Sequence, residues 1–434
     1  MTGKKIVNKN IIFLSDFDGT IGRFSPVESF NKFISGIDLS HIFDDFSKGK
    51  IGTKEAYKLL IKSIDLNIDT LNQLIDDNMY IDDSFLEYYL FLENNGIDFA
   101  VISDGYKYYI ERLFEKNGMT GINIFANEIV VNDNGMVDDV FFPHADEACV
   151  NFATCKTKII DELADKYESI FYVGDGFTDY DAAVKVDFLF ARSKLKKYAA
   201  KNNISFFGFD KFSEIKKFLS EDYQWIVFDL DGVLIDSTKA ILDSLNYCAE
   251  SLGYDKVDSV DTISEYIGLP LDEFIEKSLN CSKDESEKGK ISFREKFVDI
   301  YLDKTELLDD VKEVIKYLSG KYKLSVITNK YMEYAEELVK YLGLADFFES
   351  VYGESVEYPS KPSGELWDYF ISQNSIMDKN SILYVGDSPI DYQFAKSRGI
   401  PFVALVTGFY NEKVFFELGS SFIINSINKL KVLL

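Results

Sequence analysis

Two pairs of aspartates, each followed by a glycine, are the residues of this sequence best suited to chemistry. Asp16 and Asp18 end one apolar run, and Asp229 and Asp231 end another. An apolar run that ends at a turn signal is typical of a buried strand in a parallel sheet. Open α/β sheets hold their ligands at the carboxyl ends of such strands. Two acids there repel each other unless a cation or a shared proton intervenes. A divalent metal ion with a preference for oxygen ligands resolves the conflict most simply.

Each half of the sequence offers three further groups in the same order. They are a small hydroxyl at a strand end, Ser103 or Thr328, a lysine at a helix start, Lys156 or Lys361, and a Gly-Asp-x-x-x-Asp group, Asp175 with Asp179 or Asp387 with Asp391. Phosphoryl transfer requires such a set. One carboxylate attacks phosphorus and a second acts as acid and base. The metal ion and the lysine stabilise the phosphoryl oxygens, which a hydroxyl and backbone N–H groups hold.

The repeated motifs lie at a nearly constant offset. Asp16 and Asp229 are 213 positions apart, and Gly174 and Gly386, each within Tyr-Val-Gly-Asp, are 212 positions apart. A constant offset is the signature of repeated structural units. With 434 residues the chain also exceeds the length of one ordinary domain. We therefore predict two tandem domains, 1–220 and 221–434.

The pattern along each half alternates between strand-like and helix-like segments. In the first half we expect a helical insert at about 24–80, a strand at 96–103, a β-hairpin at 128–142 with Asn134-Gly135 as its turn, a helix at 157–167 and a strand at 169–173. In the second half we expect a helical insert at about 237–305, a helix at 311–318 and strands at 323–328 and 381–385. The predicted fold class is α/β, with two tandem Rossmann-like parallel-sheet domains and a helical insert in each.

Composition and charge exclude several classes of function. A net charge of −26 is opposite to what nucleic acids and anionic membranes attract, so neither is expected as a partner. No segment reads as a secretory signal or a membrane span. Four cysteines form no disulfide framework, and Cys149 and Cys155 lack the second pair that a zinc site needs. We expect reduced thiols and a cytoplasmic protein. The sequence does not indicate an oligomeric state.

With these motifs in this order, both halves resemble the haloacid dehalogenase superfamily of phosphohydrolases. The resemblance implies that Mg²⁺ is the cofactor and that each helical insert is a type-one cap over a small phosphorylated metabolite. The implied roles are Asp16 and Asp229 as nucleophiles; Asp18 and Asp231 as general acid and base; Lys156 and Lys361 as catalytic cations; Ser103, Asp104, Gly105, Thr328 and Asn329 as phosphate-binding residues; Asp16, Asp175, Asp229 and Asp387, with the backbone carbonyls of Asp18 and Asp231, as metal ligands; and Asp179 and Asp391 as residues that order the metal site.

Finer features separate the two halves. The first is similar to the phosphoserine phosphatase branch and, within it, to the 2-hydroxy-3-keto-5-methylthiopentenyl-1-phosphate phosphatases, although Ser-Asp-Gly stands where that branch has Ser-Gly-Gly. The second resembles phosphoglycolate phosphatases. The related β-phosphoglucomutases carry a histidine shortly after the first motif, and 238–246 contains none, which favours a hydrolase. In the first half Lys158 is a rival to Lys156, and the resemblance alone decides between them.

The predicted function is hydrolysis of small phosphomonoesters at two separate sites by aspartyl-phosphate intermediates. One alternative is a single working phosphatase domain beside a regulatory or structural one. Another is a phosphotransferase or phosphomutase, which would pass the phosphoryl group to a second metabolite. A binding module without catalysis is the remaining alternative. The sequence does not identify the substrate of either half.

Overall fold

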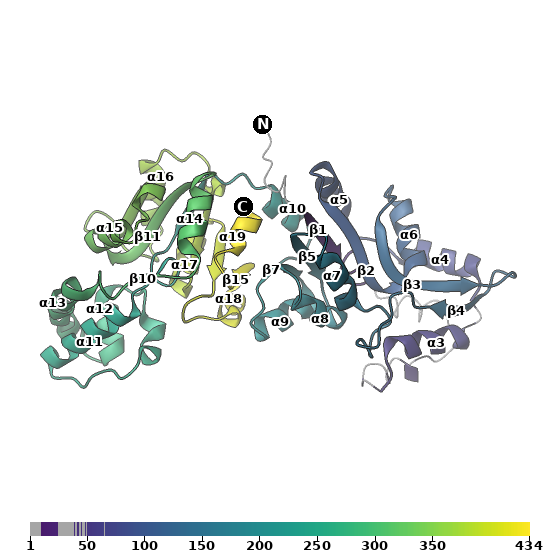
Figure 1. The fold of residues 1–434 in the computed structure, drawn as a ribbon, viewed down its shortest axis with the longest axis horizontal. Helices are drawn as coiled ribbons and strands as arrows, with labels where there is room; N and C mark the ends of the chain where they lie inside the picture. The colour runs from purple at the N-terminus through teal and green to yellow at the C-terminus, as the bar shows by residue number, and fades with distance from the viewer. Residues whose placement is uncertain are drawn as a thin grey trace. The chain divides into compact units, whose positions relative to one another are not determined.

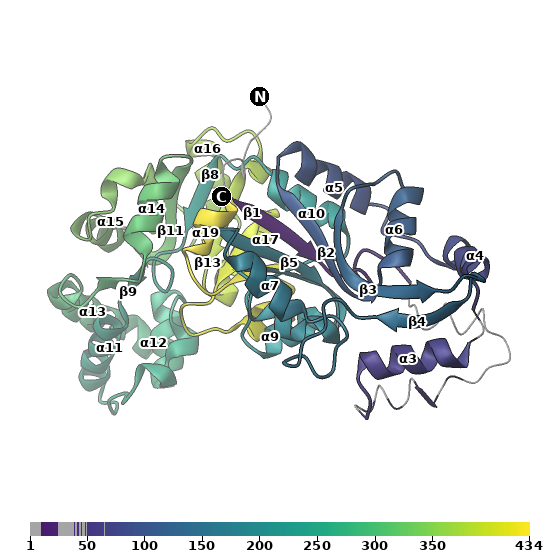
Figure 2. The ribbon, with the colours of Figure 1, turned by 45° about the vertical axis from the view of Figure 1, so that its right-hand side comes forward.

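The protein, viewed in a computed structural model, divides into two compact units, Met1–Ser220 and Glu221–Leu434. The structure describes residues 10–24, 39, 41, 42, 45, 48, 50–64 and 66–434. Parts of the first predicted insert, including 25–38, lie outside the described residues. Each unit is an α/β domain whose sheet is mostly parallel and is flanked by helices, as Figures 1 and 2 show. The α/β class predicted from the sequence is confirmed.

The first unit has the strand order β7-β6-β5-β1-β2-β3-β4. Its elements in chain order are β1 (Ile11–Ser15), α3 (Thr53–Ser63), α4 (Ile68–Asn78), α5 (Phe85–Asn94), β2 (Asp98–Tyr106), α6 (Lys107–Lys116), β3 (Asn123–Val131), β4 (Val137–Phe141), α7 (Lys156–Ala164), β5 (Ser169–Gly174), η1 (Phe177–Asp179), α8 (Tyr180–Ala183), β6 (Phe188–Ala191), α9 (Ser193–Lys201), β7 (Phe206–Gly208) and α10 (Phe212–Ser220). The predicted strands and helices occur close to their expected bounds.

Strand β1 lies at the centre of the first unit's sheet and is buried along its whole length. It pairs in parallel with β2 on one side and β5 on the other, so Ser15 faces Val101 and Val173. Right-handed crossovers between parallel strands place α5 and α6 on one face of the sheet and α7, α8 and α9 on the other. This order brings the carboxyl ends of β1, β2 and β5 to one edge.

The predicted β-hairpin is confirmed. Strands β3 and β4 pair antiparallel, with Glu128 opposite Phe141 and Val131 opposite Val137. Gly135 in the turn has a φ of +76°, a conformation that glycine adopts at little cost. The hairpin extends the sheet beyond β2, and its far end lies near the helical segment because Ile68 donates its backbone N–H to the Gly135 carbonyl oxygen at 2.9 Å.

The helical segment of the first unit leaves and rejoins the core at neighbouring positions. Gly22 and Ile81 form an antiparallel bridge. The backbone N–H of Arg23 donates to the Tyr80 carbonyl oxygen at 2.9 Å, and that of Asp82 donates to the Ile21 carbonyl oxygen at 2.8 Å. The described helices between these points, α3 and α4, are therefore inserted between β1 and α5.

The second unit has the strand order β12-β11-β8-β13-β14-β15. Its elements are β8 (Trp225–Phe228), β9 (Ile235–Asp236), α11 (Thr238–Leu252), η2 (Val260–Thr262), η3 (Ser264–Tyr266), α12 (Leu271–Leu279), α13 (Lys283–Ile300), β10 (Glu306–Leu307), α14 (Val311–Ser319), β11 (Lys323–Tyr331), α15 (Met332–Tyr341), η4 (Ala345–Phe347), β12 (Ser350–Glu354), α16 (Glu365–Gln373), η5 (Lys379–Ser381), β13 (Ile382–Gly386), α17 (Pro389–Arg398), β14 (Phe402–Leu405), α18 (Glu412–Leu418), β15 (Phe422–Ile424) and α19 (Lys429–Leu433). The central strand β8 pairs in parallel with β11 and β13.

The second unit repeats the architecture of the first around β8. Trp367 of α16 is fully buried against the sheet; its ring stacks on Phe394 at 4.6 Å and its Nε1–H donates to the Phe394 carbonyl oxygen at 3.0 Å. Residues 237–305 are helical and lie between two short antiparallel strands, β9 and β10. The two units therefore insert a helical segment at the same point of the fold, after the first strand and its two aspartates.

The prediction of four reduced thiols is wrong for two of them. Cys149 and Cys155 form a disulfide, with 5.5 Å between their Cα atoms. A turn brings them together, because the Cys149 N–H donates to the Asp146 carbonyl oxygen and the Cys155 N–H donates to the His144 carbonyl oxygen. The spacing of Cys149 and Cys155 along the sequence does not predict such a turn. Cys248 and Cys281 are free and buried. Among the described helices, none has both the length and the apolar character needed to cross a bilayer.

Candidate active sites

A buried cluster of charged groups lies at the carboxyl edge of the first unit's sheet. Asp16 directly follows β1 and is 3% exposed. Lys156, the first residue of α7, contacts Asp16 Oδ1 through its Nζ atom at 2.7 Å and Asp179 Oδ1 at 2.5 Å. Carboxylate oxygens of Asp16, Asp175 and Asp179 lie within 4.8 Å of one another. The fold thus brings residues from three distant parts of the sequence into one site.

Asp179 is held by donors on both of its oxygen atoms. Oδ1 accepts from Lys156 and from the Tyr172 hydroxyl at 2.6 Å. Oδ2 accepts from the backbone N–H groups of Asp175 at 3.0 Å and Gly176 at 2.9 Å. A carboxylate with all four of these contacts has little capacity left for a metal ion, so Asp179 is better suited to hold Lys156 and the 175–176 backbone in place.

Asp18 lies beside the same cluster in an aromatic environment. The Tyr109 hydroxyl donates to Asp18 Oδ2, while Oδ1 is buried without a hydrogen-bond partner. The Phe17 and Phe24 rings pack on Tyr109 at 5.9 and 6.0 Å. Burial raises the pKa of Asp18 to about 7. A carboxyl group with such a pKa can both donate and accept a proton near neutral pH.

The predicted phosphate-binding residues of the first unit occupy the end of β2. Ser103 and Asp104 are buried, and the Gly105 N–H donates to Ser103 Oγ at 3.0 Å. A Cβ atom on Gly105 would lie 2.4 Å from Asp18 Oδ2, so this loop is in direct contact with the acidic site. The Asp104 side chain turns away and accepts from the Thr154 N–H at 2.7 Å. Asp104 Oδ1 therefore fastens the loop before Lys156, while Asp104 Oδ2 is buried without a hydrogen-bond partner.

The second unit builds the same cluster from its own residues. Asp229 follows β8 and is 5% exposed. Lys361 Nζ lies 2.8 Å from Asp229 Oδ1 and 2.7 Å from Asp391 Oδ1. Asp391 also accepts from the Tyr384 hydroxyl at 2.7 Å and from Ser388 Oγ at 2.6 Å. Carboxylate oxygens of Asp229, Asp387 and Asp391 again lie within 4.8 Å of one another.

The two units differ around the second aspartate of the motif. Asp231 faces Lys330, whose Nζ lies 3.1 Å from Asp231 Oδ2, and Ser237, whose hydroxyl donates to Oδ1. Lys330 is only 7% exposed and lies over the Phe297 ring at 4.8 Å. In the first unit the equivalent residue, Asp18, accepts a hydrogen bond from the Tyr109 hydroxyl instead. The two sites therefore surround this aspartate with different partners.

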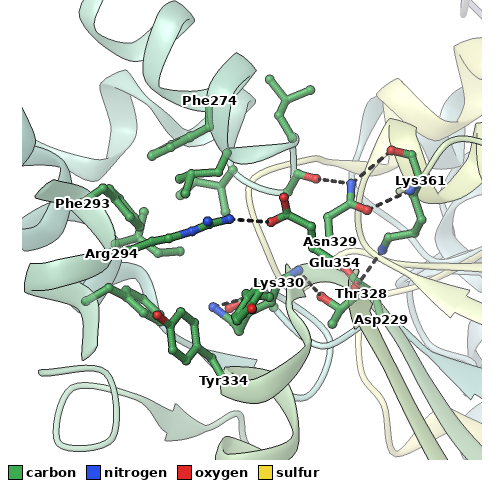
Figure 3. Close-up of a pocket in the computed structure, with 18 residues that line it drawn as sticks. Asp229, Phe274, Phe293, Arg294, Thr328, Asn329, Lys330, Tyr334, Glu354 and Lys361 are labelled. Carbon is green, nitrogen blue, oxygen red and sulfur yellow. Dashed lines mark hydrogen bonds and ion pairs between the residues drawn. The ribbon is translucent and has the colours of Figure 1, made fainter. Parts of the chain in front are cut away.

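The carboxyl end of β11 carries the remaining predicted residues of the second unit (Figure 3). Thr328 Oγ1 accepts from the Lys330 N–H at 3.2 Å. The Asn329 side chain donates to the Gly268 carbonyl oxygen at 3.0 Å and the Lys361 carbonyl oxygen at 3.1 Å, and it accepts from the Lys361 N–H at 2.8 Å. Asn329 thus ties the carboxyl end of β11 to Lys361 and to the helical segment.

Burial makes both clusters electrostatically unfavourable without a cation. Burial and the neighbouring Asp391 raise the pKa of Asp229 to about 7, and burial, followed by Asp391 and Asp229, raises the pKa of Asp387 well above its usual range. In each cluster three carboxylates face one lysine, which leaves two net negative charges. One divalent cation balances this charge, and carboxylate oxygens are the ligands that Mg²⁺ prefers. The residues present therefore fit Mg²⁺.

Sequence reasoning overlooked the tyrosines that support each lysine. The Tyr172 hydroxyl accepts from Lys156 Nζ at 3.0 Å, and the Tyr384 hydroxyl accepts from Lys361 Nζ at 3.1 Å. Both tyrosines begin the repeated Tyr-Val-Gly-Asp segment, so the repeat itself was an available signal. The rival Lys158 is half exposed and pairs with Asp146 at 3.1 Å, outside the cluster.

Gly232 lies against Asp387, so a substitution at Gly232 tests whether Asp387 binds a metal ion. Its φ is +78°, and an added Cβ atom would lie 2.0 Å from Asp387 Oδ2. A Cβ atom added to Gly408 would also meet this oxygen, so two glycines leave the space that the Asp387 side chain occupies. If Asp387 binds Mg²⁺ as the sequence predicts, we expect Gly232→Ala to weaken Mg²⁺ binding at this site at least about tenfold, since the added methyl group displaces the Asp387 carboxylate. Isothermal titration with MgCl₂, on a chain carrying Asp16→Asn to weaken the first site, measures this change.

Gly253 is the matched control for this substitution. Its φ is +80°, but no atom lies within 4 Å of its added Cβ atom. Both alanine variants therefore pay about 1 kcal/mol for the left-handed backbone conformation. Only Gly232→Ala should change Mg²⁺ affinity. Equal Mg²⁺ affinities in the two variants would show that Asp387 does not bind the metal.

Models of two known families match the chain. Residues 226–405 match a family described as Haloacid dehalogenase-like hydrolase, and residues 55–215 match one described as Putative Phosphatase. Together these matches cover most of both units, and each contains motifs that form the clusters described above.

Two individual proteins and one solved structure are similar to parts of this chain. A phosphoglycolate phosphatase of Vibrio parahaemolyticus is 27% identical over 219 residues, 48% of this chain and 95% of the relative. A 2-hydroxy-3-keto-5-methylthiopentenyl-1-phosphate phosphatase of Bacillus cereus is 28% identical over 204 residues, 46% of this chain and 92% of the relative. The crystal structure of a predicted phosphoglycolate phosphatase from Haemophilus somnus is 23% identical, with a TM-score of 0.45, and covers 48% of this chain and 96% of that chain.

Proposed function

Since both halves of this chain are haloacid dehalogenase-type domains similar to phosphatases, we propose that each half is a working Mg²⁺-dependent phosphatase with its own active site. The first site would lie in the domain 1–220 and the second in 221–434. The observation that carries the proposal is the convergence, in both units, of a buried aspartate, a buried lysine and a second acidic pair on one sheet edge. The substrates would be small phosphomonoesters.

The first step of the proposed reaction forms an acyl phosphate on the protein. Asp16 or Asp229 attacks phosphorus while the ester P–O bond breaks. The leaving oxygen takes a proton from Asp18 or Asp231. Lys156 or Lys361 holds the attacking carboxylate in place and, like the N–H groups of the 103–105 or 328–330 loop, stabilises the negative phosphoryl oxygens. Bound Mg²⁺ supplies further charge neutralisation at these oxygens.

The second step regenerates the free aspartate. Asp18 or Asp231, now deprotonated, accepts a proton from water, and the water oxygen attacks phosphorus as the acyl phosphate bond breaks. Inorganic phosphate leaves. Asp175 or Asp387 would hold Mg²⁺ together with the nucleophile, and Asp179 or Asp391 would order the site through the four donors that each one binds.

We also propose that the two inserted helical segments, about 24–80 and 237–305, are caps over these sites. The antiparallel contacts at the ends of each segment support this assignment, because they bring the points at which the segment leaves and rejoins the core side by side, as in an inserted unit. The hydrogen bond from Asn329 to the Gly268 carbonyl oxygen links the second segment directly to the phosphate-binding loop. Closure of a cap over the site would exclude water during the first step.

Removal of divalent metal ions tests the proposed function. We expect the 434-residue chain to release inorganic phosphate from members of a phosphomonoester library in MgCl₂. Excess EDTA should lower the rate by at least about 10³-fold, because the phosphoryl charge and the acidic cluster then lack their counterion. Addition of MgCl₂ beyond the chelator should restore it. Equal rates with and without EDTA would contradict the proposal, and transfer of phosphate to a second metabolite without release would indicate a transferase.

A further inference from the structure

The pocket of the second unit has two chemically different sides. Figure 3 shows Asp229, Thr328 and Lys361 on one side and Phe274, Phe293, Arg294 and Tyr334 on the other. The first group would hold the phosphate in the proposed function, on which this inference rests. The second group must therefore face the alcohol portion of the substrate.

The side of the pocket that faces the alcohol portion of the substrate is formed by five aromatic residues, which we call the aromatic wall. They are Phe274, Phe293, Phe297, Tyr331 and Tyr334, from α12, α13, β11 and α15. The rings pack on one another: Phe274 contacts Phe293 edge-on at 6.1 Å, and Phe293 stacks on Phe297 at 5.8 Å. Ring-to-ring contacts of this kind fix the shape of a surface, so the aromatic wall is formed before a substrate arrives.

Two cationic side chains border the aromatic wall among the described residues that line the pocket. Lys330 lies over the Phe297 ring at 4.8 Å and pairs with Asp231 at 3.1 Å; the other is Arg294. Its guanidinium lies 5.1 Å from the Tyr331 ring centre, and Nη2 donates to Glu354 Oε2 over a long distance, 3.4 Å. Its Nε atom is buried without a hydrogen-bond partner. The Arg294 side chain is 34% exposed, and its guanidinium has further N–H groups beyond Nε, so a ligand in the pocket that accepts a hydrogen bond from Arg294 would be favoured.

The extent of the aromatic wall decides which substrates make full use of the pocket. An alcohol portion with one flat ring and a small polar group can contact both the wall and Arg294. A two-carbon hydroxy acid would leave most of the aromatic wall without contact.

We propose that the second unit acts on phosphate esters of small alcohols that carry a flat apolar ring and an acceptor group such as a carboxylate. The ring packs against the aromatic wall, and the acceptor group binds Arg294. Two-carbon hydroxy acid phosphates are poor substrates for this site, since they bury little apolar surface there.

Three esters of primary alcohols test the proposal on the 434-residue chain carrying Asp16→Asn, which confines hydrolysis to the second unit. They are 4-carboxybenzyl phosphate, benzyl phosphate and 2-phosphoglycolate. We expect kcat/KM for 4-carboxybenzyl phosphate to exceed that for 2-phosphoglycolate at least about tenfold. Arg294→Gln should lower kcat/KM about tenfold for 4-carboxybenzyl phosphate and less than about twofold for benzyl phosphate.

Lys288→Gln is the matched control, because it removes one positive charge from an exposed position of the same helix, α13. It should leave all three substrates unaffected. A preference for 2-phosphoglycolate, or an equal loss for both benzyl esters in Arg294→Gln, would overturn the inference. If the second unit hydrolyses none of the three test esters but hydrolyses other phosphomonoesters, and Asp229→Asn abolishes that hydrolysis, the inference fails while the proposed function stands. If Asp229→Asn changes no phosphate release at all, both fail.

Discussion

Asp229→Asn is expected to abolish phosphate release by the second unit, and Asp16→Asn that by the first. An amide is a very poor nucleophile for phosphorus, so the acyl phosphate cannot form. We expect each substitution to lower kcat for its own substrates by about 10³-fold or more, which corresponds to about 4 kcal/mol in activation free energy. The double variant should release no phosphate above the background rate.

The surroundings of the two aspartates make these substitutions informative. Asparagine has nearly the same shape as aspartate, and Lys361 retains its contact with Asp391 at 2.7 Å when Asp229 is changed. Lys156 likewise retains Asp179. The folded structure is therefore expected to persist, and thermal unfolding checks it. Asp346→Asn and Asp165→Asn, at exposed positions of the second and first units, serve as controls.

The pattern of losses separates the functional alternatives. If hydrolysis of one class of substrate is lost in Asp16→Asn and hydrolysis of another class is lost in Asp229→Asn, both sites work. If only one of the two substitutions lowers activity, the chain has one phosphatase domain beside a regulatory or structural domain. Full hydrolysis in the double variant would contradict the aspartyl-phosphate mechanism.

Lys361→Met is expected to remove activity and to destabilise the second unit strongly. Lys361 is 2% exposed and lies between the carboxylates of Asp229 and Asp391. Methionine fills a similar volume without the charge, so two buried carboxylates lose their partner. Breaking a buried ion pair in this way costs about 3–5 kcal/mol of unfolding free energy. The rate of phosphate release should fall by about 10²-fold or more, because the phosphoryl oxygens also lose a cation.

Tryptophan fluorescence during urea unfolding measures the loss of unfolding free energy in the second unit alone. The sequence has two tryptophans, Trp225 and Trp367, and both lie in that unit. Lys239→Met is the control, since Lys239 and Glu306 form a pair whose side chains are 71% and 69% exposed. Such surface pairs contribute about 0–1 kcal/mol. Equal stabilities of the two methionine variants would show that Lys361 does not hold the acidic cluster together.

The sequence was sufficient for the α/β class, for the repeat and for the acidic motifs. Apolar runs that end in Asp16 and Asp229 determine strand and turn locally, because buried parallel strands need continuous apolar residues. The hairpin at Asn134-Gly135 is local for a similar reason, since its turn demands a residue that tolerates positive φ. Information of this kind is contained in a few neighbouring residues.

Only the tertiary structure decided which side chains meet. Lys156 rather than Lys158 reaches Asp16 because α7 begins at the sheet edge and points only one of these two lysines inward. Tyr172 and Tyr384 contact the lysines because their strands, β5 and β13, pair with β1 and β8. Arg294 and the aromatic wall come from helices distant in the sequence, and the Cys149–Cys155 disulfide depends on a turn. Such contacts follow from packing across the chain, which spacing along it does not encode.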